Sequence, residues 1–432
     1  MPYPGRGKQA WGLRRVGGLD DLPGGGQIVV AGDHAFVGHM DPPFGTSIID
    51  VSDPSAPRVV AQLKLPDDSS HTHKVRVVGD LMYVNVEQAD RHFKRRAARI
   101  APETQSLTAD LGRAPTEAEL AARLGVAPER MDALRAAQAE TYRDGGFRVY
   151  DIADRANPRL LVHHRTHGVG VHRFDVDARH AYISTEMAGY VGNILVVYDM
   201  ANPAAPREIG RYAAPGQHAA GGETPTWDGL RHRLHHALRF GDELWAAWWH
   251  GGFRVLDGRD LSRIAPLGVW ARIPAFPEPT HTVMPLPHRT DGRRYAVAVD
   301  EEHEHRHGAP HGFLWVFDVT DLAAITPIAA FDVSEMDSPY SRAGGRFGAH
   351  QFCERPNGAL VHVAWFAGGL RVVDLADPLA PREVAHYVPS PRGGFPAPQS
   401  NDVDVDARGL IYLIDRNRGF DILERHDRES DR

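Results

Sequence analysis

The stretch IIDVSDPSAPRVV at residues 48–60 recurs in altered form as VYDIADRANPRLL (149–161), VYDMANPAAPREI (197–209) and VVDLADPLAPREV (372–384). Looser copies occupy residues 255–267 and 316–328. Each copy indicates a strand, a turn and a second strand, because an aspartate side chain closes turns and proline cannot continue a sheet ladder. A unit that recurs along the chain in this way predicts a repeat architecture.

A second two-strand pattern with alternating apolar residues precedes these copies, as in VRVVGDLMYVNV at residues 75–86. Four strands in a unit of about 40 residues are typical of a propeller blade. Inner hairpins are expected at seven places: residues 27–38, 75–86, 174–185, 238–248, 283–299, 351–363 and 402–414. The sequence therefore predicts one all-β domain over residues 1–432, a seven-bladed β-propeller. The last unit lacks an outer strand, which residues 13–25 are expected to supply, so that the N-terminal strand closes the ring.

Composition supports this fold and limits the chemistry. The 43 glycines and 32 prolines among 432 residues favour short elements joined by turns. A single cysteine, Cys353, excludes a disulfide framework and a cysteine metal site, so any metal would be held by some of the 25 histidines and by carboxylates. The formal net charge of −7 offers no broad basic surface for nucleic acid. Because no apolar stretch suits a membrane span or a signal peptide, we expect a soluble cytoplasmic protein.

Residues 88–144 interrupt the repeat with a segment rich in Ala, Arg, Glu and Leu. Thr116 before EAEL and Pro128 at the start of a turn are helix-start signals. We therefore predict a helical insertion in the second blade that acts as a lid. Residues 112–134 resemble the helix-turn-helix stretch of sigma-70-like factors, but a packing helical hairpin is the preferred interpretation.

Five histidines occupy one position of the repeat when the inner hairpins are aligned on their turns: His73, His172, His235, His281 and His350. The same position holds Asn401 in the last unit and Gly26 in the first. The innermost strands of a propeller start together at one mouth of the channel, so equivalent residues form a ring. Clustered imidazoles repel one another unless they are deprotonated, which is the state that binds a cation. The register therefore predicts a metal site, whereas any one of these histidines alone would be read as a turn or core residue.

Carboxylates recur beside this position. Glu87 and Glu186 each follow a ring histidine by 14 residues, and Glu301 ends the second strand of the fifth unit. A ligating histidine usually donates its other ring N–H to such a group, so the three are expected to orient the ligands. His236 is expected to turn away from the channel because side chains alternate along a strand. The HEHRH tract at residues 303–307 is interpreted as a solvated loop outside the site.

The repeat resembles the LVIVD-repeat propeller family through LRVVD (370–374), FRVYD (147–151) and SIIDV (47–51), and the resemblance covers nearly all of the chain outside the insertion. The histidine set resembles the carotenoid cleavage oxygenases, seven-bladed propellers in which four histidines hold a non-haem iron that glutamates help to orient. It also resembles selenium-binding protein/methanethiol oxidase, a propeller with a histidine-bound copper. These resemblances imply Fe(II) as the first expectation for the cofactor and copper as the second.

The expected function is a metal-dependent oxygenase or oxidase that uses O2 on a small, mostly apolar organic substrate. The ring is expected to be open at Asn401 and Gly26, where O2 and substrate would approach. The apolar walls of the pocket are expected to be Trp248, Trp249, Trp365 and Phe366. Two alternatives remain at this point: a copper-dependent oxidase resembling methanethiol oxidase, and a non-catalytic propeller scaffold for protein interaction.

Overall fold

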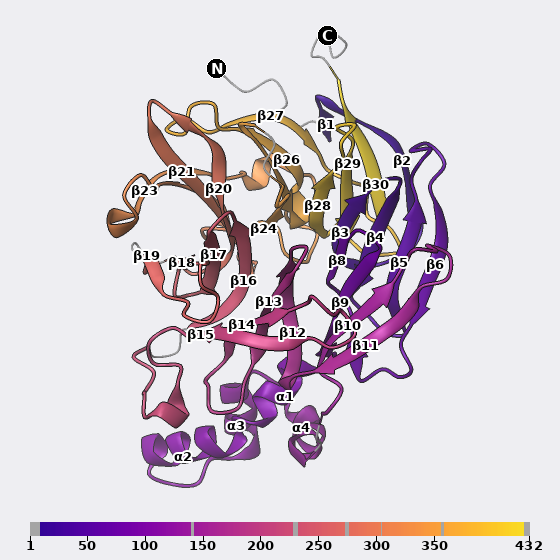
Figure 1. The fold of residues 1–432 in the computed structure, drawn as a ribbon. Helices are drawn as coiled ribbons and strands as arrows, with labels where there is room; N and C mark the ends of the chain where they lie inside the picture. The colour runs from indigo at the N-terminus through magenta and orange to yellow at the C-terminus, as the bar shows by residue number, and fades with distance from the viewer. Residues whose placement is uncertain are drawn as a thin grey trace.

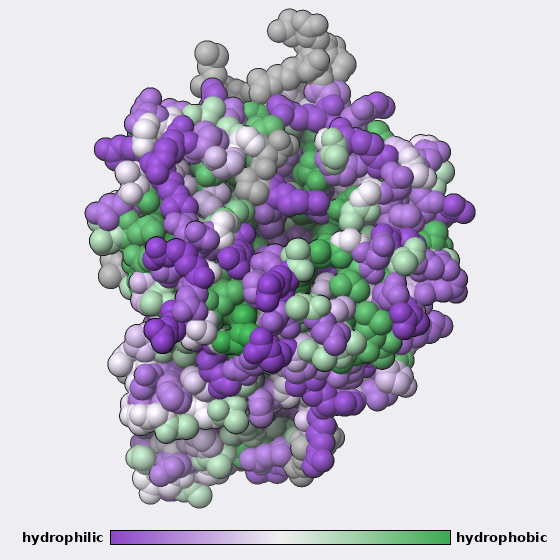
Figure 2. Space-filling model, in the orientation of Figure 1, coloured by the Kyte–Doolittle hydropathy of each residue, from purple (hydrophilic) through white to green (hydrophobic). Residues whose placement is uncertain are grey.

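The strands of the computed structural model gather around a common centre, and the helices lie together at one edge (Figure 1). The structure describes residues 9–139, 142–227, 232–272, 276–303, 305–355 and 358–426. The face in Figure 2 is mostly hydrophilic, with smaller hydrophobic patches scattered over it. No described helix is long and apolar enough to cross a membrane.

Consecutive strands pair in antiparallel order in four-stranded groups. The first group contains β3 (Gly25–Ala31), β4 (His34–His39), β5 (Phe44–Asp50) and β6 (Arg58–Lys64). The second contains β8 (Val75–Val78), β9 (Leu81–Gln88), β10 (Gly146–Asp151) and β11 (Arg159–Arg165), and β7 (Ser70–His71) also pairs with β9. The third contains β12 (His167–Val176), β13 (His180–Glu186), β14 (Asn193–Asp199) and β15 (Arg207–Tyr212).

The later groups follow the same order. The fourth contains β16 (His232–Phe240), β17 (Glu243–Trp249), β18 (Phe253–Asp257) and β19 (Pro266–Trp270). The fifth contains β20 (Thr280–Thr290), β21 (Arg293–Asp300), β22 (Leu314–Asp318) and β23 (Thr326–Phe331). The sixth contains β24 (Ala349–Phe352), β25 (Leu360–Trp365), β26 (Gly369–Asp374) and β27 (Arg382–Tyr387), with β1 (Ala10–Trp11) paired to β27. The last contains β28 (Ser400–Val405), β29 (Ile411–Asp415) and β30 (Arg418–Arg425), and β2 (Leu13–Pro23) pairs with β30.

The recurring aspartate and arginine of the repeat hold the turn between the two outer strands of a group. Asp50 accepts the N–H of Ser52 at 3.0 Å and pairs with Arg58 at 2.7 Å. Asp199 repeats the arrangement with the N–H of Ala201 at 3.0 Å and with Arg207 at 3.1 Å. An aspartate that bonds the backbone two residues on forms its own turn, so each repeat encodes this turn locally.

The apolar core lies between neighbouring groups. Tyr182 and Leu195 of the third group pack with Leu244 and Trp248 of the fourth in one buried cluster. A larger cluster joins the fourth, fifth and sixth groups in the same way. Because side chains alternate along a strand, one face of each group packs on the group before it and the other on the group after it.

The segment between β9 and β10 contains α1 (Arg91–Ala97), α2 (Ile100–Leu111), α3 (Glu117–Leu124) and α4 (Met131–Ala139). Thr116 caps α3 and exchanges hydrogen bonds with Glu119, the reciprocal cap that stabilises a helix start. Buried Leu120, Met131 and Leu134 belong to a small core of the helices themselves. The short 3-10 helix η1 (Pro128–Arg130) lies between α3 and α4, and others follow later in the chain at η2 (Ala219–Gly221), η3 (Leu322–Ala324), η4 (Glu335–Asp337) and η5 (Phe366–Gly368).

Candidate functional site

The pairing register shifts at the start of the innermost strand in six of the four-stranded groups. The shifts fall between Gly25 and Gln27, Val171 and Arg173, His232 and His236, Thr280 and Thr282, Ala349 and Gln351, and Ser400 and Asp402. Each shift passes over the residue that the sequence aligns at the ring position. A bulge leaves this residue unpaired and re-aims its side chain, so both it and the next residue can face the centre.

The structure brings the five aligned histidines into one continuous arc. Their neighbouring ring centroids are separated by 5.4 Å (His73 to His172), 4.9 Å (His172 to His235), 3.8 Å (His235 to His281) and 4.4 Å (His281 to His350). His71 extends the arc, with its ring 4.2 Å from that of His73. Sequence alignment missed His71 as a site residue, although its spacing of two from His73 was a usable signal.

Hydrogen bonds fix the tautomers of four arc histidines. The Nδ1 atoms of His172 and His235 donate to Glu87 at 2.9 Å and to the His281 carbonyl at 2.7 Å. His281 Nδ1 donates to Thr282 Oγ1 at 3.0 Å, since this hydroxyl gives its own proton to Gln351. His350 Nδ1 donates to the Asn401 carbonyl. Each neutral ring therefore keeps its lone pair on Nε2.

His73 has the opposite tautomer. The Asn85 amide is oriented by the Lys74 N–H, which donates to its Oδ1 at 2.8 Å, and by the Val171 carbonyl, which accepts from its Nδ2 at 2.9 Å. The same Nδ2 donates to His73 Nδ1 at 3.1 Å. The proton of neutral His73 is therefore on Nε2, 3.9 Å from a Glu87 oxygen. His73 thus differs from the other four histidines that the sequence aligns with it.

Burial keeps these imidazoles neutral. It lowers the pKa of His172 from 6.5 to about 4, although Glu87 acts in the opposite direction. Burial also holds the pKa values of His73, His235, His281 and His350 well below 6.5. Neutral imidazole is the form that binds a metal, so the lone pairs are available at pH 7.

Glu87 lies behind the arc at Nδ1 of His172, where the sequence places an orienting group, whereas Glu301 faces the Nε2 atoms of His281 and His350 and lines the cavity. Glu87 is directly opposite Gly170 in the ladder between β9 and β12, which places its carboxylate between His71, at 3.1 Å, and His172. Glu301 lies 3.8 Å from both His281 and His350. Burial alone would raise both carboxyl pKa values, but Arg91 and His172 around Glu87, and histidines around Glu301, hold them well below 4.5.

Glu186 does not share this role in the structure. Its carboxylate pairs with Arg95 of α1 at 3.0 Å and accepts the N–H of Val169 at 3.1 Å. It stands opposite His167 and Asn193 at the end of β13, outside the arc. Glu186 follows His172 by the same 14 residues that separate Glu87 from His73, but it does not contact the arc histidines as Glu87 does.

The predicted aromatic walls separate into two pairs. Trp249 stacks on His235 at a centroid distance of 5.2 Å, and Phe366 stacks on His350 at 4.8 Å. Trp248 and Trp365 are instead fully buried in the cores between groups. Trp248 and Trp249 are consecutive residues of β17 and face opposite sides of it, whereas Phe366 follows the end of β25 and begins η5.

A cavity of about 160 Å³ lies in front of the arc, and much of its lining is cationic: Lys74, Arg91, Arg233, Arg346 and Arg416. The side expected to be open holds Met40, Lys74 and Arg416. A Cβ on Gly26 would come within 2.7 Å of the His73 Cβ, so glycine there permits close packing rather than a gap. Asn401 donates to the Gly26 carbonyl at 2.8 Å. The predicted open, apolar side of the ring is therefore wrong.

Comparison with known proteins concerns the fold. One repeat family matches residues 25–63, which span β3 to β6, together with residues 187–214 and 357–388. The matching model is that of the LVIVD repeat. It is similar to the C-terminal WD40 domain of Sif2, with a TM-score of 0.55, 11% identity and coverage of 96% of this chain and 99% of that one. It is also similar to the WD40 β-propeller domain of Doa1, with a TM-score of 0.51, 8% identity and coverage of 96% and 97%. No curated protein matches.

These comparisons show a β-propeller with LVIVD repeats, as the sequence predicts. Identities of 8% and 11% carry the fold alone. The likeness of the histidine set to carotenoid cleavage oxygenases and to methanethiol oxidase stays a prediction.

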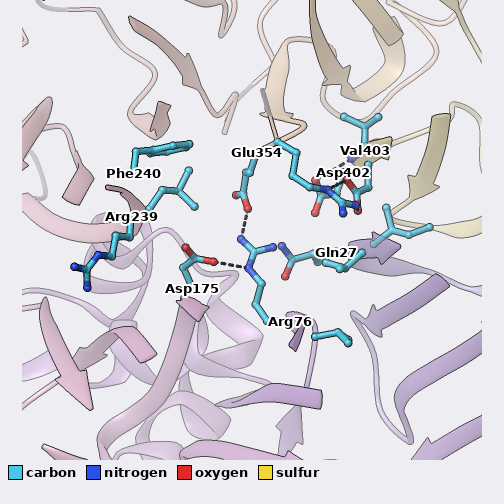
Figure 3. Close-up of a pocket in the computed structure, with 14 residues that line it drawn as sticks. Gln27, Arg76, Asp175, Arg239, Phe240, Glu354, Asp402 and Val403 are labelled. Atoms are coloured by element: carbon cyan, nitrogen blue, oxygen red, sulfur yellow. Dashed lines mark hydrogen bonds and ion pairs between the residues drawn. The ribbon is translucent and has the colours of Figure 1, made fainter. Parts of the chain in front are cut away.

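Beneath the arc, further residues of the innermost strands and of the turn after β24 form an ionic layer. Glu354 pairs with Arg76 and Arg173, and Gln351 donates to it at 2.7 Å. His236 Nδ1 lies 3.1 Å from Glu354, so the expectation that His236 turns away is wrong. The register shift between His232 and His236 breaks the alternation of side chains along β16. Figure 3 shows Arg76 between Glu354 and Asp175 in a second cavity of about 250 Å³.

A second histidine and glutamate cluster lies in the loop after β21. Glu302 is within 3.0 Å of His305 Nδ1 and 2.8 Å of His311 Nδ1, and His311 Nε2 is 3.2 Å from Glu335. The HEHRH tract therefore does not form a fully solvated loop, because the His305 side chain is only 10% exposed. Any measurement of bound metal has to distinguish this cluster from the arc.

Proposed function

We propose that the protein is a metal-dependent oxidoreductase whose site is the histidine arc of a seven-bladed propeller, closed by the pairing of β2 with β30. One observation supports the presence of a bound metal ion. The Nε2 atoms of His172 and His235 are 3.1 Å apart, and both rings have donated their Nδ1 protons elsewhere. Two lone pairs facing each other at this distance repel, and a bound cation removes the repulsion.

The ligand set follows from the tautomers. His172, His235, His281 and His350 offer Nε2 lone pairs, while His73 keeps a proton there and supports Glu87 instead. Hydrogen bonds from Nδ1 to a carboxylate, a hydroxyl or a carbonyl are the usual support of ligating histidines. The four-imidazole donor set suits iron, copper, zinc or nickel and disfavours magnesium and calcium.

The proposed reaction class is oxidation with O2, with Fe(II) as the first choice of metal and copper as the second. The bound metal would supply the redox chemistry. The protein's own residues would orient the ligands and keep them neutral, because Glu87 and the carbonyls hold the ring tautomers. Substrate would bind in the cavity in front of the arc.

Metal analysis of protein purified without a histidine tag tests this proposal. We expect one iron or copper per chain, lost in His172→Ala and in His281→Ala. The matched control is His311→Ala, which disrupts the second cluster and should leave the metal content unchanged. Metal that persists in both arc variants, or that disappears only in His311→Ala, would overturn the proposal. If iron or copper is bound, O2 consumption in the presence of reductant, absent in the arc variants, separates redox use from a structural metal.

A further inference from the structure

The charge of the cavity is the feature that the proposed function leaves unexplained. Five basic side chains line it, contributed by the segment before β8, by α1, by β16, by the loop before β24 and by the turn before β30. Two of them are balanced by carboxylates, since Arg91 pairs with Glu87 and Arg346 with Glu301, at 3.0 and 2.9 Å. Lys74 instead donates to the Gly26 carbonyl at 2.9 Å. A metal ion would add further positive charge to this small space.

Two guanidinium groups are held in place by the aromatic rings beside the arc. Arg233 lies 4.7 Å over the ring of Trp249, which stacks on His235. Arg346 lies 3.9 Å over the ring of Phe366, which stacks on His350. Stacking on an aromatic face restrains a guanidinium while leaving its N–H edge available for a planar acceptor. Both arginines are thus positioned relative to the ligand histidines.

Among the described residues, Arg416 has neither an ion pair with a carboxylate nor an aromatic ring stacked on it, unlike Arg91, Arg233 and Arg346. Its nearest described acceptor is Asn401 Oδ1 at 3.4 Å, and no described carboxylate forms an ion pair with it. Burial and the neighbouring Arg346 lower its pKa to about 9, although Glu301 and Asp41 act in the opposite direction. A guanidinium buried beside another guanidinium is costly unless an anion joins them.

We infer that the cavity binds a small organic anion whose oxyanion group, a carboxylate or a phosphate, bridges Arg346 and Arg416 in front of the histidines. Arginine binds such groups through two parallel hydrogen bonds, which also orient the rest of the ligand. The cavity volume of about 160 Å³ equals roughly five water molecules at ~30 Å³ each, so the ligand is small. This inference deepens the proposed function by naming its substrate class, and it replaces the apolar substrate expected from the sequence.

Calorimetric titration of metal-free protein in a buffer without competing oxyanions tests the inference. The probes are acetate, acetamide and inorganic phosphate: acetamide matches acetate in shape without the charge, and phosphate distinguishes the two anion classes. We expect acetate or phosphate to bind and acetamide not to bind. Arg416→Gln should weaken anion binding about tenfold or more, as expected for a lost charge-assisted hydrogen bond. Arg416→Lys should restore part of it, and the exposed Arg263→Gln should behave as wild type.

The thermal unfolding temperature distinguishes a loss of anion binding from misfolding of the variant. Because Arg416 is poorly compensated without a ligand, Arg416→Gln should unfold at the same or a higher temperature than wild type in the absence of anions. Equal binding of acetate and acetamide, or unchanged anion affinity in Arg416→Gln, would overturn the inference. Metal without anion binding leaves the proposed function standing alone. Anion binding without metal would instead contradict the proposed function and leave this inference intact.

Discussion

The two halves of the channel use neighbouring residues of the same strands for opposite purposes. His172 belongs to the arc, and Arg173, the next residue, belongs to the ionic layer. His235 and His236 divide in the same way. Both lie beside a cavity, but in the ionic layer Glu354 pairs with Arg76 and Arg173, whereas the arc presents Nε2 lone pairs beside basic side chains. Polar groups in a channel can therefore serve the fold where they form hydrogen bonds and ion pairs with one another, and can bind a ligand where they do not.

Removing the centre of the ionic layer should have the largest effect. Glu354→Gln leaves Arg76 and Arg173 buried with less compensation, and losing one partner of a buried ion pair costs about 3–5 kcal/mol. Urea unfolding measures the loss. The control, Glu424→Gln, removes an exposed ion pair with Arg14 and should cost less than about 1 kcal/mol. Equal free energies of unfolding for the two variants would contradict a structural role for the ionic layer.

Acid should destabilise the arc before the ionic layer. The pKa of His172 is about 4 in the folded protein and 6.5 when exposed. Between pH 6.5 and 4 the unfolded chain therefore binds a proton at this residue and the folded chain does not. Stability present above pH 6.5 is therefore lost as the pH falls toward 4, by about 3 kcal/mol for this residue. Unfolding of metal-free protein between pH 7 and 4 measures the slope.

The variant His172→Gln should flatten that slope. The exposed His167→Gln is its control and should keep the wild-type slope. Because the carboxyl pKa of Glu354 is held well below 4.5, mainly by Arg76 and Arg173 against the opposing effect of burial, its contribution is lost only at lower pH. A slope unchanged in His172→Gln would contradict the assignment of neutral, buried imidazole.

Glu87→Gln should reduce metal affinity by about 10- to 100-fold, the usual effect of losing a carboxylate that supports a ligating histidine. The reason is that His172 Nδ1 loses the charged acceptor that orients the ring. Competition with a chelator of known affinity gives the constant. An affinity equal to wild type would show that Glu87 serves Arg91 and the fold instead.

Glu186→Gln should have the smallest effect. Its carboxylate forms a partly exposed pair with Arg95, so stability should change by less than about 1 kcal/mol and metal content should not change. The same two measurements made for Glu87→Gln apply. A loss of metal here would restore the equivalence of the two glutamates that the sequence suggests.

Local signals explain why the sequence predicts the propeller fold and the arc. Each turn of the repeat is closed by its own residues, as Asp50 and Arg58 show, so the pattern reads directly along the chain. The five histidines share one position of that repeat, and equivalent positions of a propeller meet in space. These features need no knowledge of distant contacts.

The remaining features depend on packing that the repeat does not encode. The register shifts that turn His236 inward arise where strands start, and simple alternation misassigns them. Arg91, Arg346 and Arg416 reach the cavity from the insertion, a loop and a turn, with no common register to reveal them. The tautomer of His73 depends on the orientation of the Asn85 amide. Only the folded chain shows that the cavity is cationic.

The ladder between β2 and β30 has a consequence for synthesis of the chain. Leu13 pairs with Arg425, so β2 is synthesised about 400 residues before the strand that it pairs with. Until then β2 and the sheet that receives it both present unpaired edges, which can join another molecule as readily as their own. Chains translated from the same mRNA could therefore exchange β2 and form domain-swapped dimers. Slowing the translation of β30 should increase the fraction of such dimers.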